Sequence, residues 1–300
     1  MTRSLVSRSA RRAARTILGR WMPDRFGPGR YRSIADEYRV SDLVVEDGKV
    51  PLVWWPVAPN FGDLLSPWLI EKMTGIPAGK PRPGGPSYVS IGSVIKRALP
   101  GSLVWGTGMF GQEAETELQP DATYLAVRGP LTRARLLSHG MSCPEVYGDP
   151  ALLAPLYYHP EVKKTHEIGV IVRWSERKWQ KVEPGPGVRL IDFGTDKIEE
   201  TIDAILSCKR VVTSSLHGLI VADAYGIPSA WLASTTPKGR DFKFHDYNLS
   251  VNKHRTPKKY DLAAHPLTVE QLDKVFDFDG RAIEFNYRRL LDACPFLERV

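Results

Sequence analysis

Short apolar runs alternate with helical patterns from Val50 onward, and this alternation limits the fold more than any other feature of the chain. The segments "PLVWWPV", "SLVWGTG", "IGVIVRW" and "RVVTS" read as strands, whereas "DKIEETIDAILSCK" places its isoleucines on one face of a helix. Strands that alternate with helices are typical of parallel sheets. We therefore predict an α/β fold with two Rossmann-like domains that face a cleft.

The chain has 300 residues, enough for two domains that each bury a core. The polar stretch "APLYYHPEVKKTHE", with Pro155 and Pro160, predicts the boundary between them. We expect a basic N-terminal segment at residues 1–30, an N-terminal domain at 31–160 and a C-terminal domain at 161–300. The last pattern, "GRAIEFNYRRLLDACPF", predicts a helix that packs back across the first domain.

The composition excludes several classes of protein. A hydrophobic content of 42% with 25% charged residues is that of a globular protein. No apolar stretch approaches the ~20 residues that span a bilayer. The three cysteines, Cys143, Cys208 and Cys294, are scattered and form no metal-binding or disulfide pattern. They favour a reducing compartment, so we expect a cytoplasmic protein without a structural metal.

Much of the net charge of +7 lies near the N-terminus, where six arginines precede the first acid, Asp24. Apolar residues between them could give an amphipathic helix that binds anionic lipid. The segment also resembles a transit peptide in composition, and a basic tail without structure is equally consistent with it. In the membrane interpretation, the protein is peripheral at the inner face of the cytoplasmic membrane.

The segment "TSSLHGLIVADAYGIPSAWL" places a histidine between a strand and an apolar helix. The strand ends near Thr213, and the N-terminus of the next helix offers free N–H groups and partial positive charge. Ser214 and Ser215 add hydroxyl donors, and Gly218 would let a ligand approach the backbone closely. These features predict an anion-binding turn that contains His217. The alternative is that His217 only caps a turn.

Other predicted strand ends carry polar residues. The loop "APNFGD" contains Asn60, Gly62 and Asp63, and "YGDPALL" contains Asp149. "AVRGP" ends a strand with Arg128, whose guanidinium can bind a carboxylate or phosphate bidentately. Each has a structural alternative as a helix cap, a turn former or a surface charge. Together, at the edge of parallel sheets where ligands bind, they indicate a site.

The segments "NFGDLLSPWLIEKMTG", "VRGPLTRARLL", "GDPALL", "SSLHGLIVADAYGIPSAWL" and "FKFHDYNLSV" occur in this order. In this arrangement the chain resembles the polysaccharide pyruvyl transferase family, from roughly Val53 to Val251. The resemblance implies two Rossmann-like domains in a GT-B-like arrangement. It also implies transfer of the enolpyruvyl part of phosphoenolpyruvate to sugar hydroxyls, which leaves a pyruvate ketal on an exopolysaccharide or cell-surface glycan precursor and releases phosphate.

The resemblance also implies roles for the candidate residues. His217 would be the acid–base group, because imidazole titrates near neutral pH. Asp63 would assist it at the acceptor hydroxyls. The expected donor-binding residues are Arg128, Ser214, Ser215, Gly218, Arg173 and Lys243, and the expected acceptor-binding residues are Asn60, Gly62 and Asp149.

One departure from the family bears on the donor. Many relatives have arginine where this chain has Ser215, so either Arg128, Arg173, Lys178 or Lys243 holds the donor anion instead, or the substrate is a variant one. The chemistry needs no metal or cofactor. The expected partners are phosphoenolpyruvate and a glycan or lipid-linked oligosaccharide.

Three rival functions remain at this stage. "GTGMFG", residues 106–111, matches the dinucleotide-binding fingerprint after a strand, but it lies outside the first strand–helix unit. A nucleotide-sugar glycosyltransferase would share the predicted fold. A membrane- or nucleic-acid-binding protein would explain the basic charge. Because basic residues beyond the N-terminal segment are mixed with acids and no nucleic-acid motif is present, we expect no nucleic-acid partner.

Overall fold

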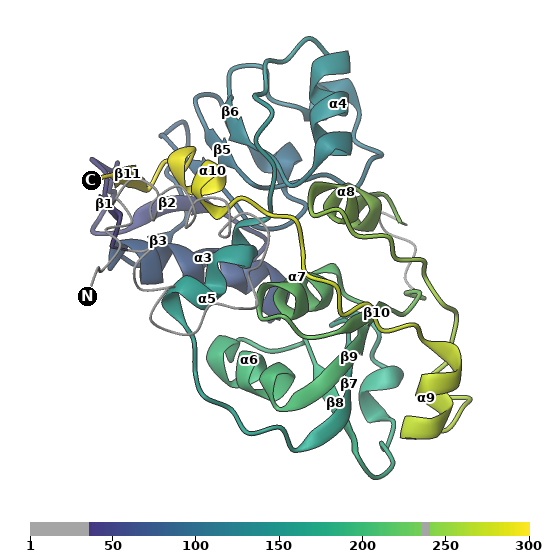
Figure 1. Cartoon of the computed structure of the whole chain (residues 1–300). Helices are drawn as coiled ribbons and strands as arrows, with labels where there is room; N and C mark the ends of the chain where they lie inside the picture. The colour runs from purple at the N-terminus through teal and green to yellow at the C-terminus, as the bar shows by residue number, and fades with distance from the viewer. Residues whose placement is uncertain (1–35, 236–240) are drawn as a thin grey trace, which may run out of the picture.

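The computed structural model describes residues 36–235 and 241–300, which form two parallel sheets surrounded by helices (Figure 1). The predicted α/β class with parallel sheets is confirmed. The predicted basic N-terminal segment, residues 1–30, lies outside the described residues. The assignment of residue ranges to domains stays a prediction.

The first sheet has five parallel strands in the order β3-β2-β4-β5-β6. Its strands are β2 (Val50–Val53), β3 (Ala78–Gly79), β4 (Tyr88–Val89), β5 (Leu103–Trp105) and β6 (Thr123–Ala126). Its helices are α3 (Phe61–Thr74), α4 (Pro130–Ser138) and α5 (Ala154–Tyr157). Strand order reverses at β2, because the next strand along the chain, β3, pairs with one side of it and β4 with the other.

The second sheet has four parallel strands in the order β10-β9-β7-β8. Its strands are β7 (His166–Val172), β8 (Val188–Asp192), β9 (Cys208–Thr213) and β10 (Ser229–Trp231). The same part of the chain contains the helices α6 (Ile198–Leu206), α7 (Leu216–Ala224), α8 (Phe242–Ser250) and α9 (Val269–Val275), of which α8 packs against α4. Strand order reverses at β7, which pairs with β8 on one side and β9 on the other.

Helix α3 begins earlier than predicted. Asn60 is its N-cap and accepts a hydrogen bond from the Gly62 N–H, so the last residues of the predicted "APNFGD" loop are helical. A polar cap of this kind satisfies an N–H that the helix itself leaves free. At the other end Gly75, with φ of 72°, closes the helix as its sequence position predicts. The early start places Asp63 in the first turn, next to the sheet edge.

Helices α3 and α7 join the two sheets through one hydrophobic core. The Phe61 N–H donates to the Phe193 carbonyl at 2.9 Å, and the two rings lie 4.4 Å apart. Phe61 comes from α3 and Phe193 follows β8, so this contact links the two halves of the chain. Every residue of α7 is buried, as its nearly continuous apolar sequence predicts. This packing fixes the carboxyl ends of the two sheets relative to each other.

The prediction of a helix over "GRAIEFNYRRLLDACPF" is wrong for most of this segment, because only α10 (Tyr287–Asp292) is helical. Ahead of it Ile283 and Phe285 are buried and Glu284 is exposed, a period of two that suits extended chain. The chain then ends in β11 (Leu297–Arg299), which pairs antiparallel with β1 (Tyr38–Val40). The Trp105 indole donates to the Leu290 carbonyl at 2.9 Å and ties α10 to the first sheet.

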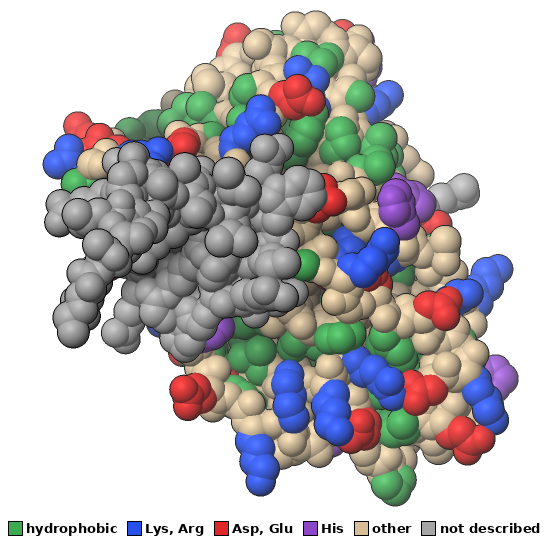
Figure 2. All heavy atoms as spheres, in the orientation of Figure 1, with side chains coloured by type: hydrophobic (Ala, Val, Ile, Leu, Met, Phe, Trp, Pro, Cys, Tyr) green, Lys and Arg blue, Asp and Glu red, His purple; other side chains and the backbone are tan. Residues whose placement is uncertain are grey.

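None of the helices within residues 36–235 and 241–300 is long and apolar enough to cross a membrane. Figure 2 shows basic and acidic side chains interspersed on the described part of one face, rather than gathered in a patch of one sign.

Candidate functional site

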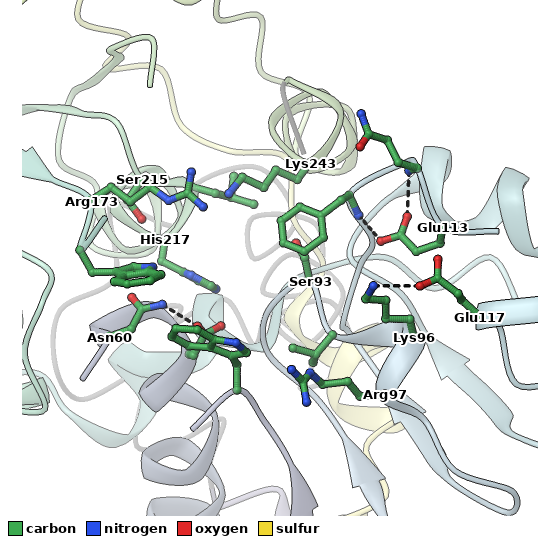
Figure 3. A pocket seen from close by; sticks show the side chains of 17 residues that line it. Asn60, Ser93, Lys96, Arg97, Glu113, Glu117, Arg173, Ser215, His217 and Lys243 are labelled. Atoms are coloured by element: carbon green, nitrogen blue, oxygen red, sulfur yellow. Dashed lines mark hydrogen bonds and ion pairs between the residues drawn. The ribbon is translucent and has the colours of Figure 1, made fainter. Parts of the chain in front are cut away.

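A cavity of about 400 Å³ lies where the carboxyl ends of the two sheets meet (Figure 3). Residues that follow β2 and β4 line one part of it, and residues that follow β7 and β9 line another. These are the two positions where strand order reverses, which is where open parallel sheets bind ligands. Its polar and aromatic lining includes Trp55, Asn60, Asp63, Ser93, Phe110, Arg173, Trp174, Ser215, His217 and Lys243.

His217 lies in the first turn of α7, two residues after the N-cap Ser215. Its side chain is 11% exposed and reaches the cavity wall. A Cβ at Gly62 would lie 2.2 Å from the Nδ1 atom of His217. Gly62 is therefore required for packing: it makes room for the imidazole and does not line the cavity. This corrects the prediction that Gly62 binds the acceptor.

Asp149 lies behind His217, away from the cavity. Its Oδ2 atom is 3.7 Å from the Nε2 atom of His217, and neither atom has a hydrogen-bond partner among the described residues. The other oxygen accepts from the Ala151 N–H and caps a 3-10 turn at Pro150–Leu153. Because Asp149 is fully buried, it cannot contact an acceptor, which corrects the prediction for this residue. The pair instead joins a buried carboxylate to the candidate acid–base group.

Asn60 and Asp63 face the cavity from the start of α3, as predicted. The Asn60 side-chain nitrogen donates to Asp63 Oδ2 at 2.5 Å, which orients the carboxylate. Burial raises the pKa of Asp63, although His217, Asn60 and Lys243 partly offset the effect. A carboxylate with a raised pKa is a better proton acceptor near neutral pH than an exposed one.

Arg173 and Lys243 bring positive charge to the cavity from opposite directions (Figure 3). Arg173 follows β7, and burial lowers its pKa. Lys243 extends from α8 with its Nζ atom 5.6 Å from the centre of the Phe110 ring. Burial, followed by the charges of Arg173 and Arg128, lowers the pKa of Lys243 to about 7. Both residues belong to the predicted donor-binding set.

Arg128 does not line the cavity, which corrects its predicted contact with the donor. It is fully buried and forms an ion pair with Asp246 on α8, with 3.1 Å between Nε and Oδ2. Its two terminal nitrogens donate to Ser93 Oγ and to the Met109 carbonyl. The guanidinium thus binds a carboxylate, as its position predicts, but the carboxylate belongs to the protein. Its effect on the cavity is to hold Ser93 in the wall.

We predict that Arg128→Lys lowers the free energy of unfolding by roughly 1–3 kcal/mol, because an ammonium cannot reach Asp246, Ser93 and the Met109 carbonyl together. Chemical denaturation measures the change. The exposed Arg82, which pairs with Asp47, provides the control, and its lysine variant should be as stable as the parent. Equal stability of the two lysine variants would contradict the structural role of Arg128.

Ser214 and Gly218 also differ from prediction. The Ser214 hydroxyl donates to the buried Glu176 at 2.5 Å and accepts from the Arg173 N–H, so it is not available to a phosphate. A Cβ at Gly218 would lie 2.1 Å from the Thr213 hydroxyl oxygen, which means that Gly218 serves helix–strand packing. Of the residues predicted in this turn, Ser215 and His217 line the cavity.

The glycines of "GTGMFG" also serve packing. A Cβ at Gly106 would meet the Pro150 ring, and one at Gly108 would meet the Arg128 guanidinium. The loop reaches the cavity through Phe110, whose N–H donates to the buried Glu113 at 2.7 Å. These contacts account for the glycine spacing without a dinucleotide.

Sequence reasoning missed the aromatic part of the wall. Trp55 and Trp174 each follow a strand by two residues, after β2 and β7, and both line the cavity. The rule that selected Asn60 and His217, position after a parallel strand, applies equally to them. Ser93 and Phe110, which follow β4 and β5, were missed for the same reason.

Comparison with known proteins finds similarity to one family. The sequence model of the polysaccharide pyruvyl transferase family matches residues 98–236, a range that includes Arg173, Trp174 and His217. The chain is 30% identical to uncharacterized protein L143 of Acanthamoeba polyphaga mimivirus over 177 residues, or 55% of this chain and 60% of that protein. It is 27% identical to the succinoglycan biosynthesis protein ExoV of Rhizobium meliloti (strain 1021) over 219 residues, or 70% of this chain and 67% of that protein.

No solved structure matches the chain. The family resemblance predicted from the sequence is confirmed.

Proposed function

We propose that this member of the polysaccharide pyruvyl transferase family moves the enolpyruvyl group of phosphoenolpyruvate to hydroxyls of an exopolysaccharide precursor, forming a pyruvate ketal. One observation carries the proposal. A single cavity combines a histidine at a helix N-terminus, the buried Lys243, the half-buried Arg173 and a carboxylate of raised pKa, and the histidine and the arginine lie within the family-matched residues 98–236. The donor has a carboxylate and a phosphate, which cations and a helix N-terminus attract.

The donor is held by Lys243, Arg173 and the start of α7, where Ser215 lines the wall. These groups replace the arginine that many relatives carry at the position of Ser215. Their charges also stabilise the phosphate as it leaves. Arg128 contributes indirectly, because it holds Ser93 in the wall and its charge helps to lower the pKa of Lys243.

The reaction then proceeds through two successive attacks of sugar hydroxyls on the same carbon. His217 delivers a proton to the methylene carbon of the donor, and a sugar hydroxyl attacks the adjacent carbon while Asp63 accepts its proton. The bond from that carbon to the phosphate oxygen breaks, and phosphate leaves. A second hydroxyl of the same sugar attacks the same carbon, its proton leaves with a base or with phosphate, and the cyclic ketal is complete. The two hydroxyl protons replace those taken up by the methyl group and by phosphate.

Two finer parts of the proposal rest on sequence. A GT-B-like arrangement of two Rossmann-like domains would give donor and acceptor opposite walls of the cavity. The basic N-terminal segment would bring the enzyme to the inner face of the cytoplasmic membrane if the acceptor is lipid-linked.

The direct test combines the purified protein with phosphoenolpyruvate and a panel of soluble glycans. We expect phosphate release and, in mass spectrometry, a glycan that has gained one pyruvate. Parallel reactions with nucleotide sugars test the rival glycosyltransferase. Glycosyl transfer without a response to phosphoenolpyruvate would overturn the proposal.

Asp149 is expected to act through His217. We predict that Asp149→Asn, which keeps the size and the cap on Ala151, lowers kcat roughly 10–100-fold, the range seen when partners that orient a metal-bound histidine are changed. The donor KM should change little, because Asp149 does not reach the cavity. Steady-state kinetics separates the two, and an unchanged kcat in a folded variant would show that the buried carboxylate does not assist His217.

A further inference from the structure

Two tryptophans from different sheets meet in the cavity wall. Trp55 follows β2 and Trp174 follows β7, and their ring centres lie 5.0 Å apart with the planes tilted by 40°. Both side chains are partly exposed, whereas Trp105, Trp179 and Trp231 are buried in the core. An indole that is left partly exposed in a cavity gains free energy when an apolar surface covers it.

The charge distribution of the cavity restricts what can cover this pair. The face of an aromatic ring is negative, so it repels a carboxylate or a phosphate and attracts polarised C–H groups. The donor anion therefore favours Lys243 and Arg173, not the indoles. A pyranose ring has a face of C–H groups and a rim of hydroxyls, so it can cover an indole while its hydroxyls reach polar side chains.

Polar groups adjoin the tryptophans in sequence and in the cavity. Arg173 directly precedes Trp174, and Asn60 and Asp63 follow Trp55 at the same switch point of the first sheet. A sugar on the indoles would thus lie next to the carboxylate that accepts its hydroxyl proton. Because the two tryptophans come from different sheets, the subsite exists only when both halves of the fold are in place.

We propose that Trp55 and Trp174 form the acceptor subsite and bind a pyranose ring of the glycan by stacking. The inference rests on the proposed function for the direction of transfer, but sugar binding itself can be measured without the donor. The two can therefore fail separately.

The experiment measures glycan binding by calorimetry in the absence of phosphoenolpyruvate. The probes are methyl β-galactopyranoside, methyl β-glucopyranoside and a β-1,4-linked glucose tetrasaccharide. Trp55→Ala and Trp174→Ala should each weaken binding about tenfold or more, and phenylalanine at either position should restore part of it, because it keeps an aromatic face. Trp68, which is partly exposed on α3 and does not line the cavity, provides the matched control as Trp68→Ala.

Kinetics gives the second readout. In the alanine variants the acceptor KM should rise at least tenfold while the phosphoenolpyruvate KM stays the same, a split that general unfolding would not produce. Four results would overturn the inference: no probe binds the parent protein, both alanine variants bind as the parent does, donor and acceptor KM rise together, or nucleotides compete for the indoles. Probe binding that depends on the tryptophans in a protein without pyruvyl transfer would leave the subsite intact and refute the proposed function alone.

Discussion

Replacing His217 with alanine is expected to lower the rate of pyruvyl transfer by roughly 10²–10⁴-fold, the usual loss when a general acid–base group is removed. The imidazole lies at the cavity wall, in the first turn of α7, with Asp149 behind it. The side chains remaining in the wall would have to deliver a proton to carbon, and Asp63 is already assigned to the sugar hydroxyl. Water would then be the main proton source.

The fold should survive this change. His217 packs against Gly62, and its Nε2 atom makes no hydrogen bond with the described residues. Alanine at this position therefore removes no hydrogen bond of that atom. Phosphate release and thermal unfolding should be measured together. His265→Ala, at an exposed position away from the cavity, is the control and should retain full activity. Near-parent turnover in a folded His217→Ala protein would remove this residue from the chemistry.

The sequence predicts that the residues of the site lie together at the ends of strands. Four residues follow apolar strands in the sequence and line the cavity: Asn60, Asp63, Ser215 and His217. The physical reason is general: the carboxyl ends of parallel strands lie on one edge of a sheet. The α/β class follows from the same alternation of strands and helices.

The direction in which a side chain points could not be predicted in this way. Arg128 and Ser214 both end strands, yet each turns toward a buried carboxylate, Asp246 or Glu176. Asp246 lies 118 residues beyond Arg128, so the pair has no local signature. A position at a strand end thus predicts that a residue lies near the site. Whether its side chain faces the ligand depends on whether a buried carboxylate of the protein binds it instead.

That competition for partners explains why we expect a lysine from α8 to be a cation that binds the donor. The carboxylate of Asp246 binds Arg128 and its neighbour Thr132, which leaves Lys243, three residues before Asp246 in the chain, to extend toward Phe110 and the cavity. No hydrogen bond or ion pair is seen for its ammonium among the described residues. A bound anion would provide the missing partner.

Lys243→Met is therefore expected to raise the phosphoenolpyruvate KM roughly a hundredfold or more, as when one member of a buried charge pair is lost. Methionine keeps much of the length and the apolar contacts. The acceptor KM should change little. Lys164→Met is the matched control, because burial also lowers the pKa of Lys164 but the residue does not line the cavity.

The pH dependence of the donor KM provides a sharper test of the same residue. The pKa of Lys243 is lowered to about 7, so its charge is present below that pH and is lost as the pH rises. Only the charged form attracts the donor, and the bound anion in turn favours the charged form. The donor KM of the parent should therefore increase between pH 6 and pH 9, with proton uptake on binding above pH 7. In Lys243→Met this part of the pH dependence should disappear. If parent and variant instead show the same increase, another group controls donor binding, and Arg173 with the N-terminus of α7 must hold the anion without Lys243.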